Sequence, residues 1–438
     1  MKKTIQRGFW IVAMLTLAIP LHAQDSVHVS LQQAIQFALS DNPTVKIDSN
    51  NILSKQYYKK EQIAALCPSL SGSASYQRTV KKQRMAMELM GETREIEMGM
   101  SNNISTGLAL TVPLIAAPSW YNLQLAEQDI EAALESARSS RISLVNEVKK
   151  AYYGLLLAQD SYRVLQASYA NAEYNAKNIS DKFEQGLASD FDKLRADVNV
   201  KNLRPQLTSS ENSIMVATLM LKVLIGADVN APIIFDGSLA DFEDEMTSYQ
   251  NIDPQTVSLD NNPDLKALSI SQDQLHTSLK LIKASACPTL AFTGNAQYMS
   301  MGNDNLSWFP YAVIGFSLNV PITSWAATAY KVKESRLSIE SLEEQKKYLD
   351  NTLRVSINSN LNSMQNAIAD MTSNKETLLQ AERAYSIVQK QYEIGMATWL
   401  DLNSAELALT QSRLLYSQSI YNFLSAKTEL DKLIGNEK

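Results

Sequence analysis

The sequence contains an internal duplication, and this feature constrains the fold more than any other. Each copy is about 200 residues long, whereas solenoid and propeller proteins repeat every 20–50 residues or so. We therefore predict one structural unit that occurs twice, over residues 24–253 and 254–438. The matched landmarks are Asn42-Pro43 with Asn262-Pro263, Cys67-Pro68 with Cys287-Pro288, Gly107–Pro113 with Gly315–Pro321, Phe183–Gly186 with Tyr392–Gly395, and Leu224–Gly226 with Leu433–Gly435.

Both copies predict the same order of elements, namely helix, strand, loop, strand, very long helix and second long helix. In the first copy the strands are expected at about 69–79 and 101–112, and the helical hairpin at about 119–226. An acidic segment, 227–253, connects the copies. The second copy is expected to place strands at about 289–300 and 310–320 and its hairpin at about 323–434.

Long helices are predicted from the scarcity of helix breakers and from the spacing of apolar residues. The 438 residues include only 14 glycines and 12 prolines. Apolar positions recur at intervals of three and four along both long segments, which is the seam of a coiled coil. Gly186 and Gly395 end these segments, and a new helix is expected a few residues later, so each pair forms an antiparallel hairpin. Nearer the N-terminus, Ser30 with Gln33 predicts a capping box that opens a short helix ending at Asn42-Pro43.

The N-terminus has the pattern of a secretory signal peptide. Lys2, Lys3 and Arg7 precede an apolar run from Gly8 to Leu21, which is too short to span a bilayer. Cleavage is expected after Ala23, so that residues 1–23 are removed on export. The net charge of −6 becomes more negative without these three cations, which makes nucleic acid an unsuitable partner.

The predicted strands alternate between apolar and small polar residues. Such a period of two gives a strand one apolar face, and about 10 residues is the length of a transmembrane β-strand. We expect the apolar positions of the second strand in each copy to face lipid. These are Ile104, Leu108, Leu110, Val112, Ile314, Phe316, Leu318 and Val320.

A sheet covering a soluble core is the alternative interpretation of these strands. Export of the chain argues against it, and the very long helices leave no helix free to cover the sheet. In lipid, however, four strands would leave unpaired edges, which hydrocarbon does not tolerate. Four strands cannot close into a barrel alone, so several chains are expected to share one barrel.

Few residues suit catalysis or metal binding. The chain has 3 histidines and 2 cysteines, and no phosphate-binding loop, nucleophile elbow or zinc spacing occurs. We therefore expect no enzyme activity, no cofactor and no metal site. The methionines of segment 81–100 could bind a soft ion such as Cu(I), but they are more simply side chains of an adaptable surface loop. Cys67 and Cys287 occupy equivalent places in the two copies, and we favour two separate thiols over a disulfide.

These features together resemble the TolC family of outer membrane efflux proteins. The resemblance covers the whole mature chain and includes the family's signature at the hairpin ends, an aromatic residue, glycine, aspartate and alanine in order. Here the signature consists of Phe183, Gly186, Asp192 and Ala196 in one copy and Tyr392, Gly395, Asp401 and Ala405 in the other. The resemblance implies a mainly α-helical homotrimer with a small β part. Each chain would give 4 strands to a shared 12-stranded β-barrel that continues into a periplasmic helical coiled-coil tunnel.

The same resemblance implies roles for residues at the hairpin ends. Contact with a periplasmic adaptor protein, which links the channel to an inner-membrane pump, is expected at Gln185, Gly186, Leu187, Ile394, Gly395 and Met396. Asp401, Asp192 and Tyr392 match the residues that close the periplasmic end. The alternative for the two aspartates is an ordinary negative charge in the first turn of a helix, stabilised by the helix dipole. Ser404 and Ala397 stand where the family can have a second aspartate and a linking arginine, which implies a less acidic and less tightly held gate.

The expected function is that of a passive exit duct in the outer membrane, carrying small molecules such as drugs and toxic compounds out of the cell. The exit duct of a type I protein secretion system has the same architecture and is the nearest alternative. A secreted coiled-coil scaffold or adhesin is the alternative from another class, and it predicts no membrane insertion.

Overall fold

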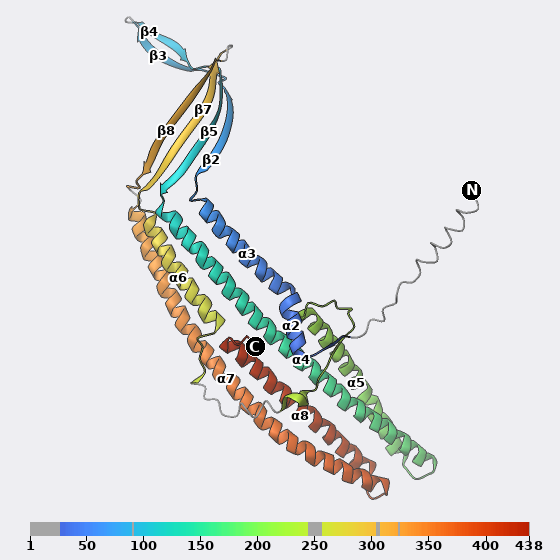
Figure 1. Ribbon diagram of the computed structural model, residues 1–438. Helices are drawn as coiled ribbons and strands as arrows, with labels where there is room; N and C mark the ends of the chain where they lie inside the picture. The colour runs from blue at the N-terminus through green and yellow to red at the C-terminus, as the bar shows by residue number, and fades with distance from the viewer. Residues whose placement is uncertain (1–26, 90–91, 244–255, 304–306, 323–324, 438) are drawn as a thin grey trace, which may run out of the picture. The chain divides into compact units, whose positions relative to one another are not determined.

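The structure is a computed structural model that describes residues 27–89, 92–243, 256–303, 307–322 and 325–437 (Figure 1). The expected signal peptide, 1–23, and the last part of the acidic segment lie outside the described residues. The chain divides into two compact units, each drawing residues from both expected copies. The helical unit comprises Met1–Lys46, Ser140–Ser258 and Arg354–Lys438, and the sheet unit comprises Ile47–Ser139 and Leu259–Leu353.

Helices predominate, and three of the four chain boundaries between the units lie within helices α3, α4 and α7. The helices are α2 (Leu31–Asp41), α3 (Pro43–Ala64), α4 (Ala117–Glu184), α5 (Asp190–Leu224), α6 (Pro263–Ala284), α7 (Trp325–Glu393) and α8 (Trp399–Ile434). The strands are β1 (Val27–Val29), β2 (Ser69–Arg78), β3 (Gln83–Leu89), β4 (Glu92–Met98), β5 (Asn102–Ile115), β6 (Ile233–Phe235), β7 (Thr289–Gly302) and β8 (Ser307–Asn319). Among the described residues, none of the helices combines the length and apolarity that a bilayer-spanning helix requires.

Helix α2 begins and ends where the sequence predicts. The Ser30 side chain accepts a hydrogen bond from the backbone N–H of Gln33, and the Gln33 side chain accepts one from the backbone N–H of Ser30, which confirms the capping box. At the other end, the backbone N–H of Asn42 donates to Ala38 and the Asn42 side-chain amide donates to the carbonyl of Leu224 at 2.7 Å. The junction of α2 and α3 is therefore fixed to the C-terminal end of α5.

The coiled-coil seams are confirmed in the helical unit. Along α4, residues Val148, Leu155, Ala172 and Ile179 are 0 to 3 % exposed, and the spacings between them follow the heptad pattern. On α7, Ile357, Met364 and Ala367 are equally inaccessible. Burial of these apolar side chains is the main favourable term that holds the hairpins together.

The segment after α5 lies along the helical unit. Strand β6 pairs in parallel with β1, and the Tyr152 hydroxyl donates to the carbonyls of Val29 and Asp236. Farther along, the Glu243 carboxylate binds the Lys375 ammonium and accepts a hydrogen bond of 2.7 Å from the Tyr416 hydroxyl. The lysine contact holds the pKa of Glu243 below its ordinary value. This segment thus connects the first hairpin to α7 and α8.

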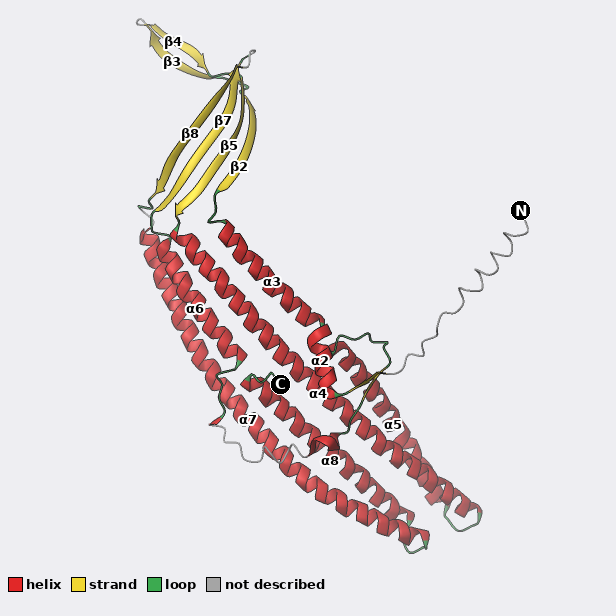
Figure 2. Cartoon of the chain, in the orientation of Figure 1, coloured by secondary structure: helices red, strands yellow, loops and turns green. Residues whose placement is uncertain are grey.

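Four strands of the sheet unit form an antiparallel sheet in the order β2-β5-β7-β8 (Figure 2). The register aligns the apolar positions of neighbouring strands. Leu110 lies opposite both Leu70 and Gly294, and Phe292 lies opposite both Val112 and Phe316. Since strand neighbours alternate between faces, one face of the sheet is apolar and the other carries mostly Ser, Thr, Asn and Gln.

The lipid-facing prediction needs one correction. Ile314, Phe316 and Leu318 lie in β8 and are 64 to 78 % exposed, but Val320 lies beyond the end of this strand. The pairing of β7 with β8 stops at Thr289 and Asn319, because the next residue opposite Val320 is Pro288, which has no backbone N–H to donate.

The expected loop at 81–100 is also corrected, because it contains the separate β3–β4 hairpin. Arg84 forms ion pairs with Glu95 and Glu97 across the two strands. Alternation of charged and apolar residues, such as Arg84 and Met85, is the signal for strand that the sequence interpretation overlooked.

Cys67 and Cys287 are free thiols, as expected.

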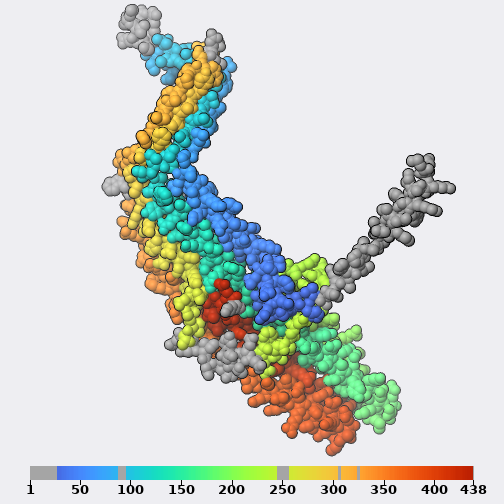
Figure 3. Space-filling model, in the orientation of Figure 1, coloured from blue at the N-terminus to red at the C-terminus, as the bar shows by residue number. Residues whose placement is uncertain are grey.

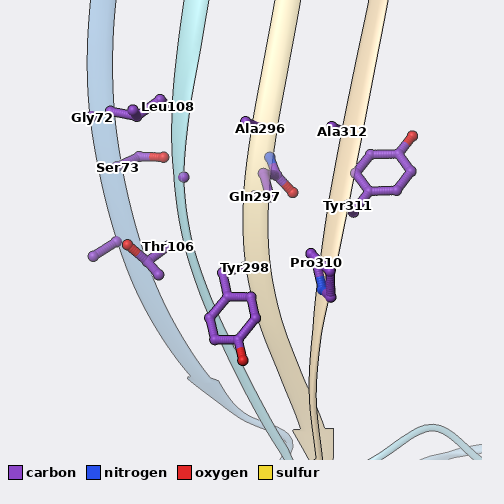
Figure 4. A pocket seen from close by; sticks show the side chains of 12 residues that line it. Gly72, Ser73, Thr106, Leu108, Ala296, Gln297, Tyr298, Pro310, Tyr311 and Ala312 are labelled. Atoms are coloured by element: carbon purple, nitrogen blue, oxygen red, sulfur yellow. The ribbon is translucent and has the colours of Figure 1, made fainter.

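A shallow hollow lies over the four-stranded sheet (Figure 4). It is lined from all four strands, by residues that include Ser73, Thr106, Gln297 and Tyr311. The register explains the hollow, since small residues meet in one row across the sheet. The row contains Gly72, Ala296 and Ala312, with Leu108 between the first two.

A substitution at Gly226 would test the contact between the C-terminal end of α5 and the α2–α3 junction. The φ of this glycine, 71°, is left-handed, and a Cβ atom there would lie 2.7 Å from the carbonyl carbon of Asp41. Gly226→Ala should therefore lower the thermal midpoint of the helical circular dichroism signal more than Gly186→Ala does. Gly186 has a φ of 74° with no atom near the added Cβ, so its alanine variant carries only the backbone strain of about 1 kcal/mol. Equal midpoints for the two variants would contradict this packing.

Candidate functional site

The residues expected at the gate lie at the ends of two helical hairpins. The first end is the turn from α4 to α5, residues 184–192, and the second is the turn from α7 to α8, residues 393–401. An apolar cluster joins them, because Trp399 of the second hairpin packs with Ile179 and Ala196 of the first. The surfaces of the two ends meet in the space-filling view (Figure 3).

Both turns have the same hydrogen-bonded geometry. Gly186 and Gly395 have φ angles of 74° and 79°, the left-handed conformation expected for a glycine that ends a helix. The N–H of Leu187 donates to the carbonyl of Lys182, and the N–H of Met396 donates to that of Gln391. These bonds define Schellman motifs, so both turns are fixed by their own backbones.

The six residues expected to contact an adaptor are exposed at these turns. Leu187, Ile394 and Met396 are 70 to 76 % exposed, and Gln185 accompanies Leu187 on the first turn. A Cβ atom on Gly186 or Gly395 would have no atom of the described residues within 4 Å. The two turns therefore present apolar side chains around an open backbone, which suits contact with another helix.

Asp401 is the third residue of α8 and forms a capping box with Thr398. Its carboxylate accepts hydrogen bonds from the Thr398 backbone N–H at 2.9 Å and from the Thr398 hydroxyl at 2.6 Å. These bonds favour the ionised form and hold the pKa of Asp401 below its ordinary value. A negative charge at this place also interacts favourably with the helix dipole.

Asp192 takes the equivalent place at the start of α5. Its carboxylate accepts a hydrogen bond of 2.6 Å from the Ser189 hydroxyl, and its backbone N–H donates to the same hydroxyl at 3.1 Å. Both aspartates therefore have a local role as helix caps, and the geometry orients their carboxylates at the first turn of each helix.

Tyr392 lies against the cluster that joins the hairpin ends. Burial raises the pKa of its hydroxyl, and the negative charge of Asp192 raises it further. The Lys182 ammonium lies 4.6 Å from the centre of the Tyr392 ring. The negative charge of Asp192 on the first hairpin thus acts on the hydroxyl of Tyr392 on the second. Asp401, in contrast, bonds to Thr398 on its own hairpin.

Glu406 is a buried carboxyl group that the sequence interpretation missed. It is 6 % exposed, and among the described residues its Oε1 atom has no hydrogen-bond partner. Burial raises its pKa to about 7, although a hydrogen bond from Asn171 of α4 lowers it in part. The available signal was a glutamate in an apolar series, because the buried residues next to it along this seam are Leu402 and Leu409.

A polar groove runs between the hairpins beside this carboxyl group. Asn171, Asn175 and Lys182 of α4 line one side, and Tyr385 and Tyr392 of α7 line the other. Across it, the Asn171 amide lies 3.5 Å from the Tyr385 hydroxyl. The contact between hairpins is therefore apolar at the tip and polar farther from it.

The chain matches known proteins along most of its length. Residues 34–227 and 256–436 match the family model for outer membrane efflux proteins. The chain is 21 % identical to the outer membrane protein TolC of Vibrio cholerae, over 76 % of this chain and 77 % of that protein. It is 24 % identical to the cobalt-zinc-cadmium resistance protein CzcC of Cupriavidus metallidurans, over 72 % of each protein. The crystal structure of the Campylobacter jejuni CmeC outer membrane channel superposes with a TM-score of 0.75 at 18 % identity, covering 93 % of this chain and 86 % of that one.

Glu406 should make the stability of the helical unit depend on pH. The raised pKa means that the fold favours the neutral carboxyl. The contribution of Glu406 to the free energy of unfolding is therefore fully present below pH 4.5 and is lost as the pH rises through about 7. Glu406→Gln should raise the thermal midpoint at pH 8, by an amount that corresponds to about 1–3 kcal/mol, and leave it unchanged at pH 4. The exposed Glu376 provides the control, since Glu376→Gln should change neither midpoint. An equal effect of Glu406→Gln at both pH values would contradict the assignment.

Proposed function

Because the chain belongs to the outer membrane efflux protein family, we propose that it is the passive exit duct of a tripartite efflux system. The protein is an outer-membrane efflux channel with a large periplasmic helical part, and its relatives are channels rather than enzymes. In the proposed system a periplasmic adaptor connects the channel to an inner-membrane pump, which supplies the energy. Small toxic molecules are the proposed cargo.

The observation that carries this proposal is the sheet with one apolar face and two open edges. Strands β2 and β8 each have one neighbour among the described strands, so each has a free hydrogen-bonding edge. Lipid can accept the apolar face but not the unpaired backbone groups. Three chains that place β8 beside the next chain's β2 would close a barrel of 12 strands and pair every edge.

Further support comes from the repeated pattern of the chain. The family model matches two segments, 34–227 and 256–436, and each ends in a hairpin with a left-handed glycine. A homotrimer of such a chain would have six hairpins around one axis. This number suits a helical tunnel below the barrel, with the first and second copies alternating.

In this arrangement the hairpin ends form the gate and the adaptor contact. The exposed turns at Gln185–Leu187 and Ile394–Met396 would receive the adaptor. Asp401 would form a ring of three carboxylates around the axis, which attracts cations and slows their passage. Thr398 orients each carboxylate in the ring.

The oligomeric state is tested by extracting the protein from the outer-membrane fraction with detergent. We expect a particle with the mass of three mature chains, and we expect deletion of the gene to sensitise cells to small toxic compounds. A soluble monomer absent from the membrane would overturn the duct in favour of the scaffold. Loss of an exported protein with unchanged sensitivity to toxic compounds would favour a secretion duct instead.

The carboxylate ring is tested by Asp401→Asn, which removes the charge and keeps a capping side chain. In planar bilayers, block of the channel by added Mg²⁺ should weaken about twofold or more relative to the unsubstituted protein. Thr398→Ala removes the hydroxyl that orients Asp401 but keeps the charge, so it should weaken the block by Mg²⁺ less than Asp401→Asn does. If Asp401→Asn leaves both conductance and block unchanged, Asp401 is a helix cap and nothing more.

A further inference from the structure

The contact between the hairpin ends uses cations from one hairpin and aromatic rings from the other. The Arg195 guanidinium of α5 lies 5.6 Å from the centre of the Trp399 ring at the start of α8. Next to it, Lys182 of α4 lies 4.6 Å from the Tyr392 ring of α7. In both pairs the first hairpin supplies the positive charge and the second supplies the ring.

Trp399 is well placed to hold the two ends together. It is the first residue of α8, directly after the N-cap Thr398, and only 8 % of its surface is exposed. Its partners Ile179 and Ala196 come from both helices of the first hairpin and are each 2 % exposed. A large ring inserted between two helices provides more buried area than any other side chain of this cluster.

Arg195 completes the enclosure of the tryptophan. It precedes Ala196 on α5 and is half-buried, and its guanidinium also lies 5.3 Å from the Phe191 ring of its own helix. The guanidinium thus lies near two rings, one from each hairpin. A cation held over the face of a tryptophan ring is attracted to the negative charge of the ring face, and partial removal from water strengthens this contact.

We propose that Arg195 and Trp399 form the latch that holds the two hairpin ends of one chain together and thereby sets how far the channel opens. This inference rests on the proposed function, since it assigns positioning residues to the proposed gate. It is also an alternative to the expectation that Ala397, in place of a linking arginine, leaves the gate less tightly held. The cation comes from the opposite hairpin instead, where Arg195 faces an aromatic residue two positions after Ala397.

The latch is tested with full-length protein in planar bilayers. Trp399→Leu and Arg195→Gln should each raise the single-channel conductance about twofold or more, and the double variant should resemble the single ones because both remove the same contact. Phe191→Leu is the matched control, because it removes the ring of the same hairpin and should leave the conductance unchanged. Particle mass and helix content should be the same for all variants, which separates opening of the gate from loss of the fold.

The possible failures are distinguishable. If the unsubstituted protein forms no channel, the proposed function fails. If it forms channels and Arg195→Gln retains their conductance, the latch alone is overturned, whatever Trp399→Leu does. A conductance that rises as much in Phe191→Leu as in Arg195→Gln would also overturn the latch, because the guanidinium would then act within its own hairpin.

Discussion

The pairing of backbone groups at the two edges of the sheet is the constraint on which the rest of the molecule depends. The register places the apolar side chains of β2, β5, β7 and β8 on one face of the sheet, yet among the described strands β2 and β8 each have an open edge. In hydrocarbon, each unpaired N–H or C=O group costs several kcal/mol, so a single chain in lipid would be far from stable. In the proposed barrel, a partner for these edges would therefore be a condition of folding as well as of function.

Local signals in the sequence predicted much of this structure correctly. Three features depend only on neighbouring residues, so the amino-acid sequence alone is enough to predict them. They are the capping box at Ser30, the end of α2 at Asn42 and the left-handed glycines at 186 and 395. The heptad seams are also local, because each position follows from the one three or four residues before it. The end of β8 was less predictable, since it depends on the register with β7, which places Pro288 opposite Val320.

The parts of the candidate site that sequence analysis missed depend on contacts between distant segments. Arg195 and Trp399 are far apart in the chain, and only the fold shows that the guanidinium faces the ring. Glu406 resembles an ordinary surface residue until its seam is known to be buried. For Asp192 and Asp401, a charge in the first turn of a helix was the alternative that the sequence left open, and the fold shows that each carboxylate does bond to the N-cap residue of its helix.

The two Schellman turns have a consequence for how such a gate can move. Their backbones are hydrogen-bonded from Lys182 to Leu187 and from Gln391 to Met396, and a serine or threonine caps the helix that follows each turn. Neither turn contains a stretch of backbone without hydrogen bonds that could accommodate a large change of φ and ψ angles. Each hairpin end should consequently move as a stiff lever, with the deformation spread over many turns of the long helices as a gradual change of supercoil. A gate of this kind would open when the long helices twist anywhere along their length. A protein that binds these helices far from the hairpin ends could therefore still open it.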